Sequence, residues 1–252
     1  MRLWVDTDVG TNPDDAVTLL CAAGHPDVDL AGVSTVDGDT EWRAAIAREL
    51  VASPVVAGAH LTVDDVRRAE PDALLAIGPL TNVAGLLRRE WRPPRLAVMG
   101  GVLRRLRHRG RTRVVEHNFG SDPDSARAVL DALEGVLVCP LDVTARMRLP
   151  DRARRRLVAA EPALDELFDE WIERQRSFGV PPAEAGVCLN DPLALLALLG
   201  EPGIRVEQHR LTVKRDGSVR ERDAAQKHTV VVDADVDASM ERIVALVERA
   251  SR

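Results

Sequence analysis

The stretch Asp6-Thr7-Asp8-Val9-Gly10-Thr11-Asn12-Pro13-Asp14-Asp15 holds four aspartates and lies between two apolar segments. The run Leu3-Trp4-Val5 precedes it, and a helix-like apolar pattern over residues 16–20 follows it. This order predicts a buried strand, a tight turn and a helix, with carboxylates at the strand end and the helix start. Carboxylates this close repel one another and are costly to desolvate unless a cation lies among them. A hard divalent cation with oxygen ligands meets that need, so the stretch predicts a metal-dependent enzyme.

The composition is typical of one α/β domain. The chain has 252 residues, 45% of them hydrophobic, which is enough for a full core. Because no Gly/Ser/Pro-rich linker or internal repeat divides the sequence, we predict a single domain over residues 1–252. The formal net charge of −6 argues against nucleic acid as a partner.

The cysteines and the apolar segments indicate the compartment. The three cysteines lie far apart in apolar sequence without a CxxC pair, so neither a zinc knuckle nor a disulfide framework is predicted. No signal-like start or apolar run of membrane-spanning length is present. We therefore expect a cytoplasmic protein with no membrane partner.

Short β-rich runs alternate with helical patterns along most of the chain. Predicted strands cover residues 2–6, 30–36, 55–57, 73–77, 95–99 and 136–143, and predicted helices cover residues 13–23, 40–52, 81–89, 123–133, 151–160, 163–177 and 192–199. This alternation predicts an α/β fold with a Rossmann-like open, mostly parallel sheet flanked by helices. Residues 204–213 and 229–232 predict a small late antiparallel extension, closed by a helix over residues 239–248.

Polar clusters occur at the carboxyl ends of the predicted strands. They are Asp6/Asp8, Asp37-Gly38-Asp39, Gly78-Pro79-Leu80-Thr81-Asn82, Gly100-Gly101 and Asp142-Val143-Thr144. Ligands of open α/β sheets bind at that end of the strands, so we expect these clusters to converge on one edge of the sheet.

Each cluster also has an ordinary structural explanation. Asp14 and Asp15 suit the positive end of a helix, and Asp191 before Pro192 resembles a helix N-cap. Capping does not account for Asp8 at the mouth of a strand.

A third group surrounds His117. Glu116 and Asn118 alternate on one side of a segment that we expect to be extended. An acceptor and an amide side by side can hold a sugar hydroxyl, although polar loop residues also bond their own backbone. Both interpretations stay open at this point.

Together the motifs resemble the inosine–uridine-preferring nucleoside hydrolases nearly end to end. The residues that carry the resemblance are Asp6-Thr7-Asp8, Asp14-Asp15-Ala16, Thr35-Val36-Asp37-Gly38-Asp39, Gly78-Pro79-Leu80-Thr81-Asn82, Val98-Met99-Gly100-Gly101, Glu116-His117-Asn118, Asp122-Pro123, Leu141-Asp142-Val143-Thr144 and Asn190-Asp191-Pro192-Leu193-Ala194. The resemblance implies a calcium-dependent N-ribohydrolase of purine or pyrimidine metabolism that takes a small nucleoside substrate. It also implies a homodimer or homotetramer.

The resemblance further implies a calcium site. Asp8, Asp15 and Asp191 match the calcium-binding carboxylates of the family. Thr81 matches the residue that offers its backbone carbonyl to the ion.

The same resemblance implies a ribose site. Asp14 matches the aspartate that holds ribose hydroxyls, and Asp39 stands where many members have an asparagine facing the ribose. Glu116 and Asn118 match the pair that binds the 5′ end of the ribose.

The expected chemistry is direct displacement of the base by water. Negative carboxylates stabilise the oxocarbenium-like sugar, and a calcium ion orients a water and lowers its pKa. Asp8 is our predicted base for that water. Many members have a histidine where this chain has Asn190, which can donate a hydrogen bond to the departing base but cannot deliver a proton. Trp171 could reach the base, although we expect it to pack in the protein.

Two further departures concern loops. The segment between Gly58 and Pro71 is short and lacks the His-Gly loop of many members. Residues 104–113 are rich in arginine and lack a Gly-Asn pair of the family, with Gly110 or Arg111 near its place. We expect this run to be a solvated loop, and the alternative is that it recruits an anionic substrate such as a nucleotide.

Two rival functions remain. Asp6-Thr7-Asp8-Val9-Gly10-Thr11 superficially resembles the nucleophile motif of haloacid-dehalogenase-type phosphatases, which also need a lysine downstream. The only lysines, Lys214 and Lys227, lie in the late hairpin region, which argues against that chemistry. The other rival is a catalytically impaired nucleoside-hydrolase-like binding protein, which the departures at Asn190 and in the loops would favour.

Overall fold

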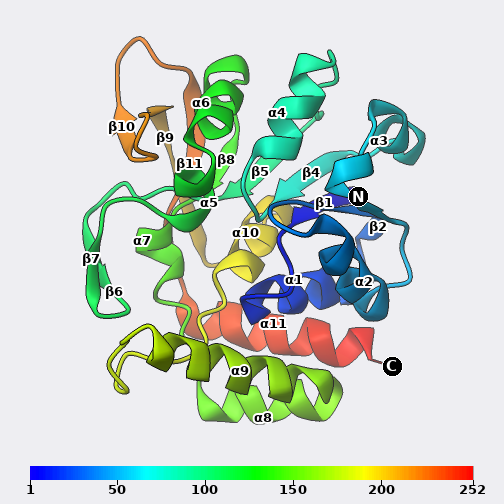
Figure 1. Cartoon of the computed structure of the whole chain (residues 1–252), viewed down its shortest axis with the longest axis vertical. Coiled ribbons are helices and arrows are strands. Elements are labelled where there is room, and N and C mark those ends of the chain that lie inside the picture. Colours follow the sequence, from blue (N-terminus) through cyan, green and yellow to red (C-terminus); the bar gives the residue numbers. More distant parts are fainter. Residues whose placement is uncertain (252) are drawn as a thin grey trace.

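The computed structural model describes residues 1–251 as a layered α/β protein (Figure 1). One sheet of nine strands has the order β10-β9-β11-β8-β5-β4-β1-β2-β3. All neighbours from β11 to β3 pair in parallel, whereas β9 pairs antiparallel with both β11 and β10. The predicted open, mostly parallel sheet with a late antiparallel extension is confirmed.

The strands of the main sheet are β1 (Arg2–Thr7), β2 (Asp29–Thr35), β3 (Val55–Ala57), β4 (Ala73–Ala76), β5 (Leu96–Met99), β8 (Leu137–Cys139), β9 (Ile204–Val213), β10 (Val219–Glu221) and β11 (Lys227–Ala234). A separate hairpin is formed by β6 (Leu106–His108) and β7 (Arg111–Arg113).

The helices are α1 (Pro13–Gly24), α2 (Thr40–Leu50), α3 (Val63–Ala69), α4 (Thr81–Arg88), α5 (His117–Ser121), α6 (Pro123–Ala132), α7 (Leu141–Thr144), α8 (Asp151–Ala160), α9 (Ala163–Ser177), α10 (Asn190–Leu199) and α11 (Val236–Ala250), with a 3₁₀ turn η1 (Gly58–His60). Helices α8 and α9 have the predicted bounds. The predicted helix that closes the late strands is α11, which is longer than expected at both ends.

Two apolar cores cover the two faces of the sheet. Alternate residues of β1 serve both, because Leu3 and Val5 belong to one core and Trp4 to the other. The first core includes residues of α1, α10 and α11, and the second includes residues of α4 and α6. In α1, eleven of the twelve residues are buried, which explains why its sequence is apolar on almost every side.

Two local predictions are wrong, and two features were not predicted. The expected strand over residues 136–143 ends at Cys139, because Pro140 has no N–H to continue a ladder and caps the helical turn α7 instead. Glu116 and Asn118 are not on an extended segment, since Glu116 caps the short helix α5. Helix α3 and the β6–β7 hairpin were not predicted at all.

The parallel arrangement brings the carboxyl ends of β1, β2, β4, β5 and β8 to one edge of the sheet. The polar clusters that follow these strands begin there, as predicted. Within residues 1–251 we find no helix whose length and apolar character would suffice to cross a bilayer.

Candidate active site

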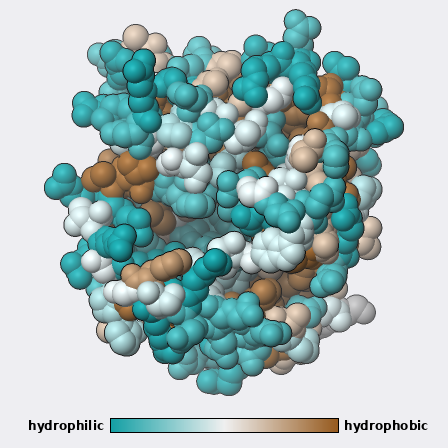
Figure 2. Space-filling view, in the orientation of Figure 1, coloured by the Kyte–Doolittle hydropathy of each residue, from teal (hydrophilic) through white to brown (hydrophobic). Residues whose placement is uncertain are grey.

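A cavity of about 700 Å³ lies at this edge of the sheet. Its walls come from the loops after the parallel strands, the β6–β7 hairpin, α5, α9 and the start of α10. The surface in Figure 2 is hollowed near the middle of this face and is mostly hydrophilic there. The cavity brings together seven of the predicted site residues: Asp8, Asp14, Asp15, Glu116, Asn118, Asn190 and Asp191.

Three buried carboxylates converge in the cavity. Asp14 and Asp15 lie in the first turn of α1 and Asp191 in the first turn of α10. One oxygen from each lies within 4.8 Å of the others, and all three residues are buried. Burial, followed by repulsion from the neighbouring carboxylates, raises the pKa of Asp15 and of Asp191 well above the ordinary value. The group therefore favours a cation or protons among its oxygens.

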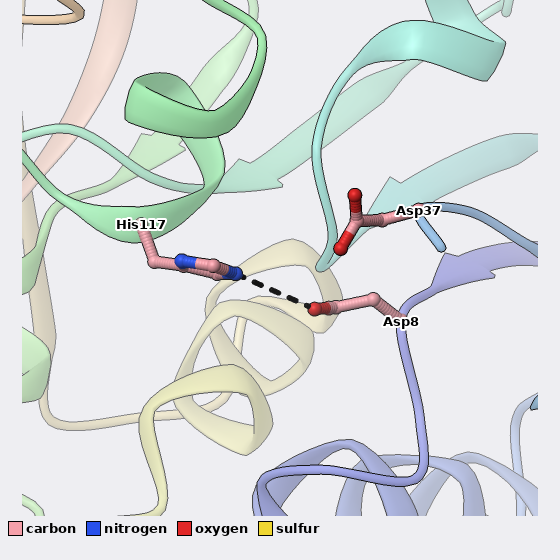
Figure 3. A group of neighbouring side chains, drawn as sticks. All are labelled: Asp8, Asp37 and His117. Carbon is pink, nitrogen blue, oxygen red and sulfur yellow. Dashed lines mark ion pairs between the residues drawn. The ribbon is translucent and has the colours of Figure 1, made fainter. Parts of the chain in front are cut away.

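Asp8, which we predicted to converge with Asp15 and Asp191, is not one of the three carboxylates of this group and belongs to a second group. Burial raises its pKa to about 7, while Arg43 opposes the shift and Asp14 and Asp37 add to it. Figure 3 shows Asp8, Asp37 and His117 pointing toward one another from three separate segments. Asp8 Oδ2 is 3.9 Å from His117 Nε2, and ligand atoms of all three residues lie within 4.8 Å of one another.

Arg43, which the sequence did not single out, holds the loops behind this group. It is buried on α2 and donates from Nη1 to the carbonyl oxygens of Asp8 and Val9 and from Nε to that of Asp37. One guanidinium thus fixes the loops after β1 and β2 together. An arginine inside a helical pattern carries no sequence signal for this role.

Asn190 is tied to Asp14 across the molecule. Its Nδ2 donates to Asp14 Oδ2 at 2.8 Å, and its backbone N–H donates to the same oxygen at 3.2 Å. Helix α10 begins at Asn190, so Asp191 lies inside the first turn and is not the N-cap. Asn190 Oδ1 and Asp14 Oδ1 are buried without a hydrogen-bond partner. This pair thus keeps unused acceptors beside the carboxylates.

Glu116 and Asn118 have structural roles at the cavity wall. Glu116 accepts from the backbone N–H groups of Asn118, Phe119 and Gly101. The Asn118 amide donates to the carbonyl oxygens of Ile77 and Met99. Burial raises the pKa of Glu116, although these hydrogen bonds oppose the shift. Backbone bonding, which the sequence left open, is therefore present, while both residues still line the cavity.

Asp39 and Thr81 are placed outside the cavity lining. Asp39 is exposed and caps α2 by accepting from the Trp42 N–H at 3.0 Å. Thr81 is exposed and its hydroxyl donates to Asp122 at 2.6 Å. Ile77 does line the cavity, and its carbonyl oxygen accepts from the Asn118 amide at 2.9 Å. A Cβ added at the adjacent Gly78 would lie 3.1 Å from Asp8 Oδ1.

Asp6 does not line the cavity either. Its side chain is buried and accepts from Ser34 and Asn82. Burial raises its pKa to about 7. Its contacts link β1 to β2 and α4, so this first aspartate is part of the framework.

One arginine of residues 104–113 contradicts the expectation of a solvated loop. Arg109 is half-buried in the cavity wall, with its guanidinium carbon 4.8 Å from the centre of the Trp171 ring. Arg109 Nη2 and Trp171 Nε1 are both buried without a hydrogen-bond partner. The remaining arginines on this run are exposed or half-exposed: Arg104, Arg105, Arg107, Arg111 and Arg113.

The neighbouring His108 has a lower pKa than an ordinary histidine. Burial, followed by the charges of Arg109 and Arg113, lowers its pKa to about 4. It is therefore neutral at pH 7. The sequence signal that could have found this wall is the Arg109-Gly110 dipeptide between two short runs, which is compatible with a two-residue hairpin turn.

Comparisons of the sequence with known proteins give the following matches. A family model described as inosine-uridine preferring nucleoside hydrolase matches residues 47–242. An uncharacterised fission yeast protein is 25% identical, over 79% of this chain and 80% of its own length. The non-specific ribonucleoside hydrolase RihC of Escherichia coli is 31% identical over 57% of this chain, and the match spans 62% of RihC.

Solved structures share the fold over the whole chain. A purine-preferring ribonucleoside hydrolase from Gardnerella vaginalis superposes with a TM-score of 0.81 at 19% identity, covering 100% of this chain and 99% of its own. A plant nucleoside hydrolase gives a TM-score of 0.81 at 17% identity, with 99% and 98% covered. At such identities the likeness establishes the fold.

Proposed function

Because this chain belongs to the inosine-uridine preferring nucleoside hydrolase family, whose members are N-glycosyl hydrolases, we propose that it hydrolyses the N-glycosidic bond of a ribonucleoside or related ribosyl compound with calcium as its cofactor. The observation that carries the proposal is the convergence of buried Asp14, Asp15 and Asp191 in the cavity. The cavity volume is in the range of small-molecule sites.

The donor set fits calcium, which prefers six to eight oxygen ligands. Asp15 and Asp191 would hold the ion, and Asp8 would supply a third carboxylate ligand. Thr81 lies away from the cavity, so the Ile77 carbonyl replaces it in our proposed ligand set. When bound, calcium supplies positive charge that holds the ribose diol and acidifies a water.

The side chains account for the remaining steps. Asp14, bonded to Asn190, accepts from a ribose hydroxyl, and Glu116 and Asn118, which line the same cavity, receive the 5′ end of the sugar. Asp8 takes a proton from the attacking water while the water oxygen bonds to C1′. The buried carboxylates stabilise the positive charge that develops on the sugar ring. Water displaces the base directly, with no covalent intermediate.

Release of base from a panel of nucleosides, with calcium present or chelated, tests the proposal. We expect release only with calcium. Asp191→Asn should lower kcat/KM by about 10³-fold, since several kcal/mol of charge stabilisation are lost. Asp124→Asn is the matched control, because Asp124 is exposed on α6 away from the cavity. Ribose binding without release of any base would instead favour the catalytically impaired binding protein.

A nucleoside and its 5′-monophosphate should be compared in the same assay. Buried Glu116 would repel a 5′-phosphate, so we propose an uncharged 5′ end. Better turnover of the monophosphate would contradict this. The homodimer or homotetramer and the cytoplasmic location stay predictions, and light scattering tests the former.

A further inference from the structure

The cavity wall made by the β6–β7 hairpin and α9 is basic. Within the described residues these two elements line the cavity with Arg109, Arg113, Arg174 and His108, and with no acidic side chain. The proposed metal and ribose residues supply the carboxylates instead. The carboxylates of the cavity therefore come from elements other than this wall.

Arg109 is the member of this wall that is held in place. Its guanidinium lies over the Trp171 ring, and its hairpin is tied to the segment after α9, because Glu184 accepts from the Gly110 N–H and from Arg107. Arg109 Nη2 nevertheless has no hydrogen-bond partner. A buried donor atom without a partner is costly, and a ligand that accepts from Nη2 would remove that cost.

The position of Arg109 relates it to the sugar site. Arg109 lines the same cavity as Asp14, which the proposed function places on a ribose hydroxyl. Asp14 is also bonded to Asn190, whose amide has no proton to transfer. His108 is neutral at pH 7 and holds no spare proton either. Among the described groups of this wall, a fixed positive charge is what remains to help a leaving group.

We propose that Arg109, stacked on Trp171, is the group that stabilises the departing base, and that the base leaves as an anion. This inference rests on the proposed ribohydrolase function. The C1′–N bond breaks with both electrons on the base nitrogen, and that negative charge pairs with the guanidinium. Water bonds to C1′ and gives its proton to Asp8. After release the base anion takes a proton from solvent and Asp8 returns its proton to solvent, so the products are ribose and neutral base.

The proposal defines the substrate class. Because the base leaves as an anion, cleavage favours ribosides whose free base loses a proton readily. Rates for a series of 5-substituted uridines should therefore rise as the free base becomes more acidic.

The first test separates leaving-group help from all other roles of Arg109. Arg109→Met keeps a long side chain against Trp171 and removes the charge. We expect it to lower kcat/KM for uridine about 100-fold or more, but to change kcat/KM for p-nitrophenyl β-D-ribofuranoside less than about threefold. The nitrophenolate anion is stable without help, whereas the uracil anion is not. Arg111→Met is the control, because it removes the same charge from an exposed position of the same hairpin.

The second test measures binding without catalysis. 5-Nitrouracil is an anion at neutral pH and uracil is not. By calorimetry the wild type should bind 5-nitrouracil at least about tenfold more tightly than uracil, and Arg109→Met should abolish that preference. Arg111→Met should retain it.

Three outcomes overturn the assignment. Equal losses on uridine and on the nitrophenyl riboside would make Arg109 a structural residue. Unchanged rates on both would remove it from the reaction. A wild type that cleaves neither riboside would overturn the assignment of Arg109, whereas release of base from no nucleoside of the panel would overturn the proposed function itself.

Discussion

At the scale of single residues, Asp15 and Asp191 destabilise the folded protein, yet they are the proposed ligands of the ion. Each is buried beside other carboxylates, and mutual repulsion adds to desolvation. Residues that destabilise a protein while serving its ligand are typical of functional sites.

Asp15→Asn should separate the two effects. We expect the calcium-free variant to unfold at a higher temperature than the calcium-free wild type, because one buried charge is gone. Activity with calcium should fall by about 10³-fold. Differential scanning calorimetry with a kinetic assay checks both. A lower melting temperature without calcium would show that the Asp15 carboxylate is stabilised by the hydrogen bond from Thr7 more than it is strained by its neighbours.

The turn at Arg109 yields a second prediction at this scale. Arg109 has φ = 50° and the next residue, Gly110, has φ = 74°. Asparagine tolerates the left-handed region better than alanine does. Since Arg109→Asn and Arg109→Ala both lose the guanidinium and the contact with Trp171, their difference isolates the backbone. We expect the asparagine variant to be about 1 kcal/mol more stable in urea unfolding, and equal stabilities would contradict the turn argument.

Residue-level roles were only partly predictable. The aspartate spacing and the family motifs led to Asp8, Asp14, Asp15, Asp191 and Asn190, all of which the structure brings to one cavity. Arg43 and Arg109 were missed, because their roles depend on contacts between segments far apart in the sequence. Asp39 and Thr81 carry motif positions, yet their side chains serve a helix cap and a surface hydrogen bond.

At the scale of elements, α1 is the helix on which the site depends. It carries Asp14 and Asp15 in its first turn and packs along α11. At Gly24 the two helices approach so closely that an added Cβ would overlap the carbonyl oxygen of Leu246. The glycine thus permits a backbone contact rather than a turn.

Two helical glycines therefore give opposite predictions. Gly24→Ala should destabilise the protein by about 1–3 kcal/mol, because α1 and α11 must separate. Gly85→Ala in α4 is the matched control, since its Cβ would meet only the Arg88 side chain at 3.8 Å. We expect it to stabilise by about 0.5–1 kcal/mol. Urea unfolding measures both, and destabilisation of similar size in the two variants would refute the packing argument.

The elements predicted best are long stretches with one sustained helical or β-rich sequence pattern. The long runs of α8, α9 and β9 were predicted with correct bounds. The predicted strand through Pro140 failed because an apolar run does not reveal where a ladder ends. The β6–β7 hairpin was missed because its strands have only three residues each and are rich in charged side chains, so they show no β-strand pattern.

At the scale of the whole molecule, buried acids make global stability depend on pH. In the folded protein the pKa values of Asp6 and Asp8 are raised to about 7, whereas in the unfolded chain they are near 4. The folded state therefore binds more protons between these values. The contribution of these two carboxyl groups to the free energy of unfolding is complete below about pH 4, and it is lost as pH rises through about 7.

The melting temperature of calcium-free protein should accordingly fall between about pH 5 and pH 8. Calcium should stabilise the protein more at pH 8 than at pH 5, because protons compete for the same oxygens. Thermal unfolding across this range, with and without the ion, measures both trends. A calcium effect that is equal at the two pH values would argue against a site made of Asp8, Asp15 and Asp191.

The hydrogen bond between Asn190 and Asp14 joins residues 176 positions apart. During synthesis on the ribosome, α1 emerges early and must wait for α10 before the acidic centre exists. A nascent chain that stops short of Asp191 carries two of the converging carboxylates without the third. The ion can therefore stabilise only a polypeptide that extends past Asp191, and shorter termination products lack the third carboxylate of the site.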